Sequence, residues 1–115
     1  MKKRYALTSG MDTSITLEID TTKMTAEYAA DVNGFWSGAV EVLGAAGGDI
    51  FQAVARRAAG RLLGYLLDGY NERGAVEVLS EQEGWPDKDH IGITIIDHEI
   101  PNLDAAMFEA EELAV

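Results

Sequence analysis

The sequence predicts a two-layer α+β domain, in which a small, mainly antiparallel sheet of three strands carries two long helices on one face. Three observations lead to this class. Apolar and polar residues alternate over residues 14–20, two later stretches place apolar residues at helical spacing, and residues 91–96 form a β-branched run. The predicted order is β-β-α-α-(α)-β-α, and a chain of 115 residues suits a single domain over residues 1–115.

Two strands come first, at residues 3–8 and 14–20, joined by a hairpin loop over residues 9–13. In the second strand Ile15, Leu17 and Ile19 alternate with polar neighbours, which is typical of a strand with one buried and one wet face.

A long helix is predicted to begin after Thr25, which can cap it, and to run to about Leu43. Its apolar stripe is Tyr28, Val32, Phe35 or Trp36, Ala39 and Leu43. The glycine-rich stretch 44–48 ends it.

The second long helix begins at Asp49, which forms a capping-box pattern with Gln52, and it ends near Leu67 before Gly69. Residues 74–82 fit either a helix or a strand, and the continuing Ser80–Glu83 segment favours the helix.

The last third contains a loop around Pro86, a strand over residues 91–96 and a short terminal helix after Pro101. Asn102 or Asp104 is the predicted cap of that helix, and its thin apolar stripe is Leu103, Met107 and Ala110.

The charge is concentrated at one end of the chain. Twenty acidic and nine basic residues give a net charge of −11, and residues 77–115 hold eleven of the acids with a single base, Lys88. Such a field repels phosphate backbones, so direct nucleic-acid binding is disfavoured, whereas a basic protein partner or divalent cations are compatible with it. Alternatively, the acids simply keep a small domain soluble.

Several classes of protein are excluded. The chain has no cysteine, so it has no disulfide, no thiolate metal site and no Cys nucleophile. The run after Arg4 is too short and polar for a secretory signal, and three arginines interrupt the most apolar stretch, residues 50–67. We therefore expect no membrane contact and a cytoplasmic location.

Both long helices carry glycines four residues apart, Gly34 and Gly38 in the first and Gly60 and Gly64 in the second. A glycine inside a helix costs about 1 kcal/mol relative to alanine, so close packing of another backbone is expected to offset the loss. The neighbour is either the other helix of the same chain or a second subunit.

The weak candidates for metal binding flank the third strand: Asp87, Asp89, His90, Asp97, His98 and Glu99. At about 3.3 Å per residue the two groups lie roughly 23 Å apart, so they cannot share one ion. On the strand, Asp97 and Glu99 are expected on one side and His98 on the other, with Ile96 and Ile100.

No catalytic residue or cofactor is predicted. The serines lack a nucleophile elbow, although Ser37, His98 and Asp97 could still assemble in space, and no phosphate-binding loop occurs.

Further interface candidates are Arg57 and Arg61, which form a basic cluster with Arg56, and the loop residue Trp85. The arginines can pair with the acidic tail of the same chain or of a partner subunit, or bind an anion. Trp36 and Trp85 fit either a core or an interface.

The segments Phe35–Ala39 (FWSGA) and Gln82–Asp87 (QEGWPD), followed by the 91–93 strand, resemble a small uncharacterised family of bacterial chromosomes and mobile elements, a domain of unknown function. The resemblance implies that setting and no chemistry.

These observations favour a non-enzymatic, acidic protein–protein interaction module, accessory or regulatory, with a protein partner or a homodimer. The alternative is a small metal-binding protein or hydrolase that uses the Asp, His and Glu groups beside the third strand.

Overall fold

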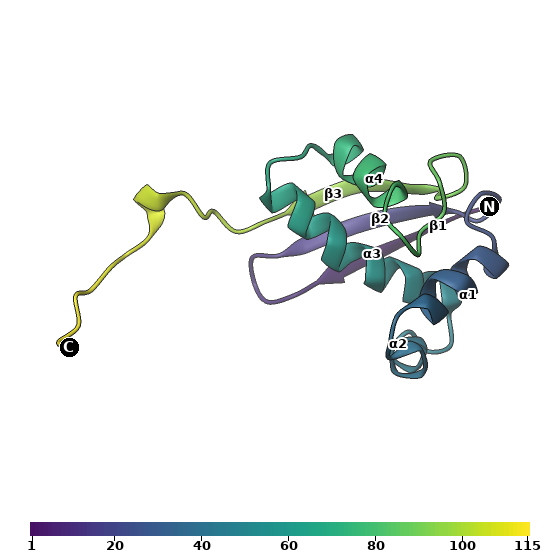
Figure 1. Ribbon diagram of the computed structural model, residues 1–115, viewed down its shortest axis with the longest axis horizontal. Helices are drawn as coiled ribbons and strands as arrows, with labels where there is room; N and C mark the ends of the chain where they lie inside the picture. The colour runs from purple at the N-terminus through teal and green to yellow at the C-terminus, as the bar shows by residue number, and fades with distance from the viewer.

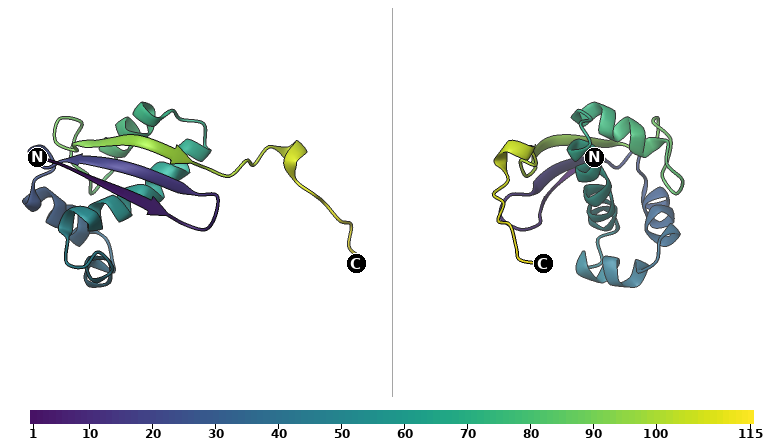
Figure 2. Two further views of the ribbon diagram at one scale, coloured as in Figure 1. Left: turned by 180° about the vertical axis from the view of Figure 1, so that it is seen from behind. Right: turned by 60° about the vertical axis from the view of Figure 1, so that its left-hand side comes forward.

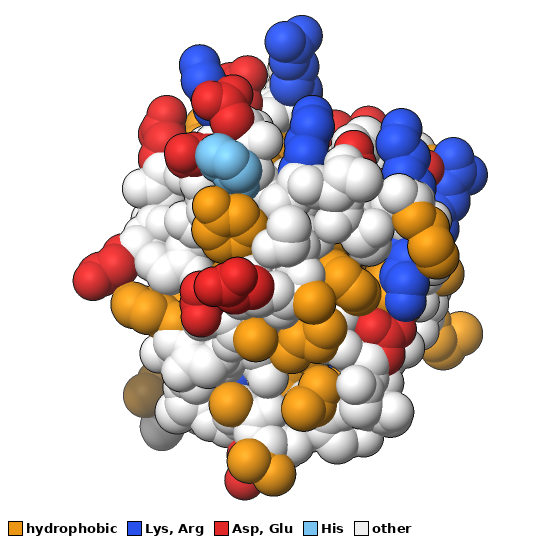
Figure 3. All heavy atoms as spheres, turned by 90° about the vertical axis from the view of Figure 1, so that its right-hand side faces the viewer, with side chains coloured by type: hydrophobic (Ala, Val, Ile, Leu, Met, Phe, Trp, Pro, Cys, Tyr) orange, Lys and Arg blue, Asp and Glu red, His pale blue; other side chains and the backbone are white.

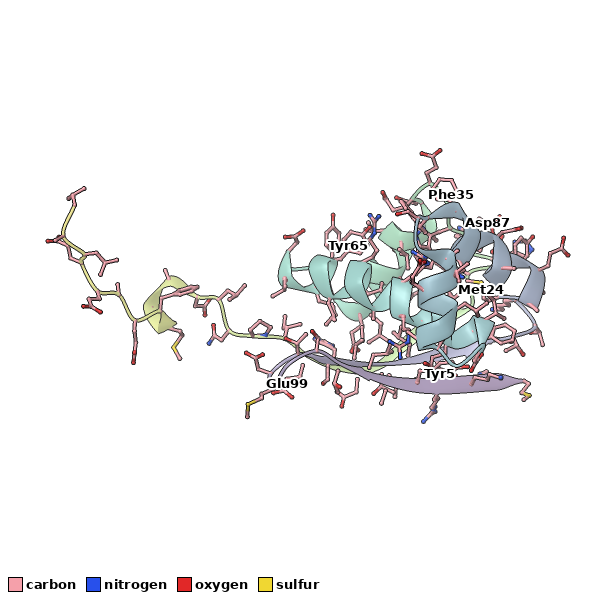
Figure 4. The ribbon with its side chains drawn as sticks, turned by 90° about the horizontal axis from the view of Figure 1, so that it is seen from below. Tyr5, Met24, Phe35, Tyr65, Asp87 and Glu99 are labelled. Atoms are coloured by element: carbon pink, nitrogen blue, oxygen red, sulfur yellow. The ribbon has the colours of Figure 1, made fainter.

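The computed structural model describes residues 1–115 and confirms the α+β class and the order of elements (Figure 1). The elements are β1 (Lys2–Thr8), β2 (Ser14–Asp20), α1 (Ala26–Phe35), α2 (Ala39–Ala45), α3 (Ile50–Leu67), α4 (Glu72–Ser80), β3 (Ile93–Glu99) and a short 3-10 turn, η1 (Ala105–Met107). Figure 4 shows the two layers, with the helices on one side of the sheet and the other side bare.

The sheet is antiparallel with the order β1-β2-β3, so β1 and β3 each have a free edge. Tyr5 of β1 lies opposite Leu17 of β2, and Ile95 of β3 lies opposite the same leucine. The next pair joins Thr16 to Asp97, so Ile96 is the extra residue of a β-bulge.

The core lies between the sheet and α3. The inner side chains of β2, which are Ile15, Leu17 and Ile19, are fully buried, as the period-two pattern predicted. The buried face of α3 is rich in alanine, for example Ala55 and Ala58, and small side chains allow a helix to pack closely on a sheet. The wet face of the sheet is mostly polar, with Ser14, Thr16 and Glu18 of β2 on it, as is usual for antiparallel sheets.

The predicted helix from Thr25 to Leu43 is wrong in its extent, because the chain breaks into α1 and α2. Trp36 is extended (ψ 154°) and Gly38 has φ 79°, a left-handed conformation that glycine adopts readily. Tertiary contacts, which are described below, stabilise this break. The local periodicity of apolar residues cannot predict such contacts.

The remaining boundaries mostly follow the sequence. Asp49 caps α3 through the backbone N–H groups of Phe51 and Gln52, and residues 72–80 form a helix, as favoured. The third strand is displaced to Ile93–Glu99. The predicted terminal helix is wrong, since only η1 forms there and its three residues pack against no other element.

Residues 101–115 leave the domain beyond the end of β3 and extend away from it (Figures 1 and 2). This tail accounts for the elongated shape, with principal extents of 55 × 28 × 24 Å. None of the helices combines the length and the apolar character needed to cross a bilayer.

Candidate protein-interaction surfaces

A groove of about 660 Å³ runs along the free edge of β3, between this strand and α4. One wall is the continuous stretch Ile91–Ile95, and the other is the exposed side of α4. Its apolar lining is Ile91, Ile93, Ile95 and Val76, of which the three isoleucines belong to the core and are at most 7% exposed, whereas Val76 is partly buried. The groove thus combines an edge strand with an apolar strip, which is the arrangement that binds extended peptides in other folds.

The edge strand presents unpaired backbone groups to this groove. The N–H of Asp20 donates to the carbonyl of Gly92 at 2.8 Å, so the backbone of Gly92 faces β2. Successive residues of a strand face opposite ways, so Ile93 and Ile95 direct their N–H and C=O groups toward the free edge. No backbone group of a turn or loop bonds to them there. Such groups are a template for another strand.

Glycine is required where the groove begins. Gly92 has φ 60°, and a Cβ atom at this position would lie 2.9 Å from the carbonyl oxygen of Asp20 and 3.0 Å from the Cβ of Lys23. The absence of a side chain therefore allows β3 to enter the sheet beside β2.

At the other end of the groove His98 joins β3 to α4. Its Nδ1 lies 2.6 Å from Oε2 of Glu72, in the first turn of the helix. His98 lies opposite the buried Ile15, so it faces the helix layer. The prediction that His98 shares this face with Ile96 is wrong. The bulge turns Ile96 outward, where it is 40% exposed.

The charges around the groove are partly paired. Lys2 lies 3.6 Å from Glu18, and Arg73 lies 3.7 Å from Glu77. Two further lysines at the beginning of β3, Lys23 and Lys88, line the groove and form no ion pair. Two acids lie at the same end of the groove as these lysines. They are Asp20, which accepts a hydrogen bond from the hydroxyl of Thr22, and Asp89.

The predicted metal candidates do not converge. Asp87 accepts hydrogen bonds from the backbone N–H groups of Asp89 and His90, and its Oδ1 lies 2.8 Å from Nδ1 of His90. The hydrogen bond with His90 is the main cause that lowers the pKa of Asp87. This cluster closes a surface turn, and the tilted ring of Tyr28 lies 5.4 Å from the imidazole.

The second group, Asp97, His98 and Glu99, is also dispersed. Asp97 and Glu99 lie opposite Thr16 and Ser14 on the bare side of the sheet, as predicted, whereas His98 is bonded to Glu72. The chain contains no group of three or more His, Asp or Glu side chains able to hold an ion. The connection between α1 and α2, which holds Ser37, and the end of β3, which holds Asp97 and His98, lie toward opposite ends of the domain (Figure 1), so this set does not assemble.

The helix glycines are open to solvent. A Cβ atom on Gly34, Gly60 or Gly64 would meet nothing within 4 Å, and on Gly38 it would meet only Glu41, at 3.8 Å. The predicted close packing within the chain is therefore wrong. The helix cost of about 1 kcal/mol for each glycine in α1 and α3 has no intrachain compensation.

The arginines of α3 secure the break between α1 and α2. Arg57 donates from Nε to Oδ1 of the buried Asn33 at 2.8 Å and from Nη2 to the carbonyl of Ser37 at 3.3 Å. Arg61 stacks on the ring of Trp36 at 4.7 Å. Neither arginine pairs with an acid of the same chain. Their intrachain pairing with the acidic tail is thus a wrong prediction.

The two tryptophans differ in exposure. Trp36 is half-buried beside Phe35, which is 49% exposed. Trp85 belongs to the core, so its prediction as a surface anchor is wrong. The turn at Gly84 (φ 89°) brings the chain against the ring of Phe35, which would lie 2.5 Å from a Cβ atom there. Only tertiary packing reveals this contact.

Exposed apolar side chains occur at two places. Figure 3 shows the end of the molecule where α1 and α2 lie, with hydrophobic side chains gathered on its lower part. Tyr28, Phe35 and Val40 are exposed in these helices. The second place is the tail, where Leu103, Met107, Phe108, Leu113 and Val115 are each more than half exposed.

Sequence reasoning missed the groove, the Glu72–His98 pair and the Arg57–Asn33 bond. The β-branched run identified β3 as a strand, but pairing partners far away in the sequence decide that it is an edge strand. The alternation of Ile91, Ile93 and Ile95 was the available signal for the apolar strip of the groove.

Comparison with known proteins gives one match. A family model described as "Protein of unknown function (DUF2528)" matches residues 14–109, from β2 to just beyond η1. No curated protein and no solved structure matches the chain.

Proposed function

The chain belongs to the DUF2528 family, whose function is unknown, and we propose that it is a non-enzymatic interaction module that receives an extended segment of a protein partner in the groove beside β3. One observation carries this proposal. Ile93 and Ile95 offer unpaired backbone groups inside a groove of about 660 Å³ with an apolar strip. Main-chain hydrogen bonds would supply affinity, and the strip would select apolar side chains at alternate positions.

The charge distribution supports the same function. The acidic last third of the chain is suited to a basic surface, as a field of one sign steers a partner of the other sign. An accessory or regulatory role in a bacterial cytoplasm, with a mobile-element setting, is part of this proposal.

Selection from a displayed library of random peptides, with the folded domain as bait, tests the groove without knowledge of the natural partner. Val76→Lys puts a long charged side chain into the groove, and Val40→Lys makes the same change on the exposed surface of α2. We expect peptides with alternating apolar residues that lose binding to Val76→Lys and keep binding to Val40→Lys. If no selected peptide distinguishes the two variants, the groove is not a peptide site.

A second surface for the same function is the helix face with Gly34, Gly38, Gly60, Gly64, Arg57 and Arg61. The open glycines favour it, because their helix cost is not offset within one chain, and a backbone of a second copy could approach them closely. Light scattering on Gly60→Leu and Gly64→Leu tests this surface, since a leucine would separate two close backbones. A dimer that both variants retain argues against it.

A further inference from the structure

The tail, residues 101–115, has the character of a segment that a partner covers. It contains four acids and no base, and its five large apolar residues are exposed. Its only regular element, η1, contacts no helix or strand of the domain. Exposed apolar groups at this density are typical of a docking segment.

Part of the tail carries a strand pattern. Phe108, Glu109, Ala110 and Glu111 alternate apolar and acidic residues, so an extended conformation places the apolar side chains on one face and the carboxylates on the other. This is the pattern expected of a strand that lies on the apolar strip of the groove.

We propose that residues 106–112 of one copy add as an antiparallel strand to the free edge of β3 in a second copy, which forms a tail-exchanged dimer. This inference rests on the proposed function, and it names the partner as the chain itself. The tail strand bonds to the edge backbone of Ile93 and Ile95, its apolar residues lie beside the partly buried Val76, and the exchange is symmetric, as in most homodimers.

The direction of the tail supports a second copy as the partner. The tail continues in the direction of β3, away from its own groove (Figures 1 and 2). When a twofold axis relates two copies, a segment that continues one β3 strand runs antiparallel to the other, with no reversal of the chain.

The charges agree with this direction. The incoming tail meets the groove first at the Glu72–His98 end and reaches the beginning of β3 with its later residues. There Glu109 and Glu111 approach Lys23 and Lys88, the lysines without ion pairs. These two lysines offer the opposite charge to the tail, although Asp20 and Asp89 line the same end of the groove.

Light scattering after gel filtration, with amide hydrogen exchange at Ile93 and Ile95, tests the exchange on the full chain. We expect a dimer in which both amides are protected. Phe108→Asp in the tail and Val76→Lys in the groove should each give a folded monomer. Met11→Asp and Val40→Lys, which make the same changes at exposed positions, should leave the dimer intact.

Two combinations make the test specific. A mixture of Phe108→Asp and Val76→Lys restores one intact tail–groove pair, so we expect dimers from two monomeric proteins. Lys88→Glu and Glu109→Lys should each weaken the dimer, and the double variant should recover it. Lys88→Glu and Glu109→Lys change exposed residues, so this pair still tests the exchange if Val76→Lys does not fold.

Other outcomes overturn the inference. A monomer whose Ile93 and Ile95 amides are protected, and lose protection in Phe108→Asp, means that the tail closes on its own groove. A dimer that Phe108→Asp leaves unchanged uses another surface. Library peptides that bind the groove while tail variants have no effect would refute the exchange and leave the proposed function standing.

Discussion

His98 near the end of β3 and Glu72 in the first turn of α4 lie 2.6 Å apart, Nδ1 to Oε2, and they tie the helix to the edge of the sheet where the groove ends. The N-terminus of a helix also favours a carboxylate, so Glu72 has two stabilising interactions. Residues 26 apart in sequence therefore set the spacing between the two walls of the groove.

Loss of this pair is expected to loosen α4. We predict that Glu72→Ala lowers the free energy of unfolding by about 1 kcal/mol, the net worth of a partly exposed hydrogen bond of a charged group. Urea denaturation measures the change. Glu77→Ala on the same helix is the control, since its exposed pair with Arg73 is worth about 0.5 kcal/mol or less. Equal losses in the two variants would contradict a special role of Glu72.

The glycines of α3 and Gly92 are predicted to respond to alanine in opposite directions. Gly60→Ala and Gly64→Ala should each stabilise the folded monomer by about 1 kcal/mol, because the added Cβ meets open space and alanine favours helix. Gly92→Ala should destabilise it, because of the φ of 60° and the carbonyl of Asp20 at 2.9 Å. Thermal unfolding of the three variants measures both signs. Destabilisation by Gly60→Ala would show that another backbone packs there.

Arg57 is predicted to stabilise the break between α1 and α2. Arg57→Ala leaves Oδ1 of the buried Asn33 without its partner, which costs about 1–3 kcal/mol. The exposed Arg56, which donates to the carbonyl of Ala45, is the matched control, and we expect a smaller loss for Arg56→Ala. Amide exchange should rise around Ser37 in Arg57→Ala alone. Unchanged exchange there would show that Gly38 suffices to break the helix.

Tyr5 and Asp49 couple β1 to the cap of α3 and make this contact sensitive to acid. The hydroxyl of Tyr5, which lies between the layers (Figure 4), donates to Oδ2 of Asp49 at 2.7 Å. Burial raises the pKa of Asp49, but the hydrogen bonds from Tyr5, Gln52 and Phe51 and the charge of Lys3 outweigh it, so the pKa falls below its ordinary value of 3.8. A lowered pKa means that the stabilisation is present above pH 3.8 and is lost as the pH falls further.

Tyr5→Phe removes one of these hydrogen bonds. We expect a loss of about 1 kcal/mol near neutral pH, and a difference from the unchanged protein that narrows below pH 3.8, where Asp49 becomes protonated in both. Urea denaturation at several pH values measures the difference. A gap that stays constant in acid would mean that Tyr5 acts through packing and not through the carboxylate.

The sequence by itself determined the class of fold, because periodicity and caps are local. The alternation in β2, the cap at Asp49 and the β-branched run before Asp97 each predict their element without any knowledge of its neighbours. The family-like segments likewise lie within the residues that the family model matches.

Tertiary structure decided what the surfaces can do. Arg57 and Gly38 break a helix that apolar periodicity continues, the turn at Gly84 buries Trp85, and the metal candidates bond to separate neighbours. Whether Ile93 and Ile95 have a free edge depends on β3 pairing with β2 alone. Such features arise from contacts between residues far apart in the sequence. A local sequence pattern does not show which distant residue will pack against it.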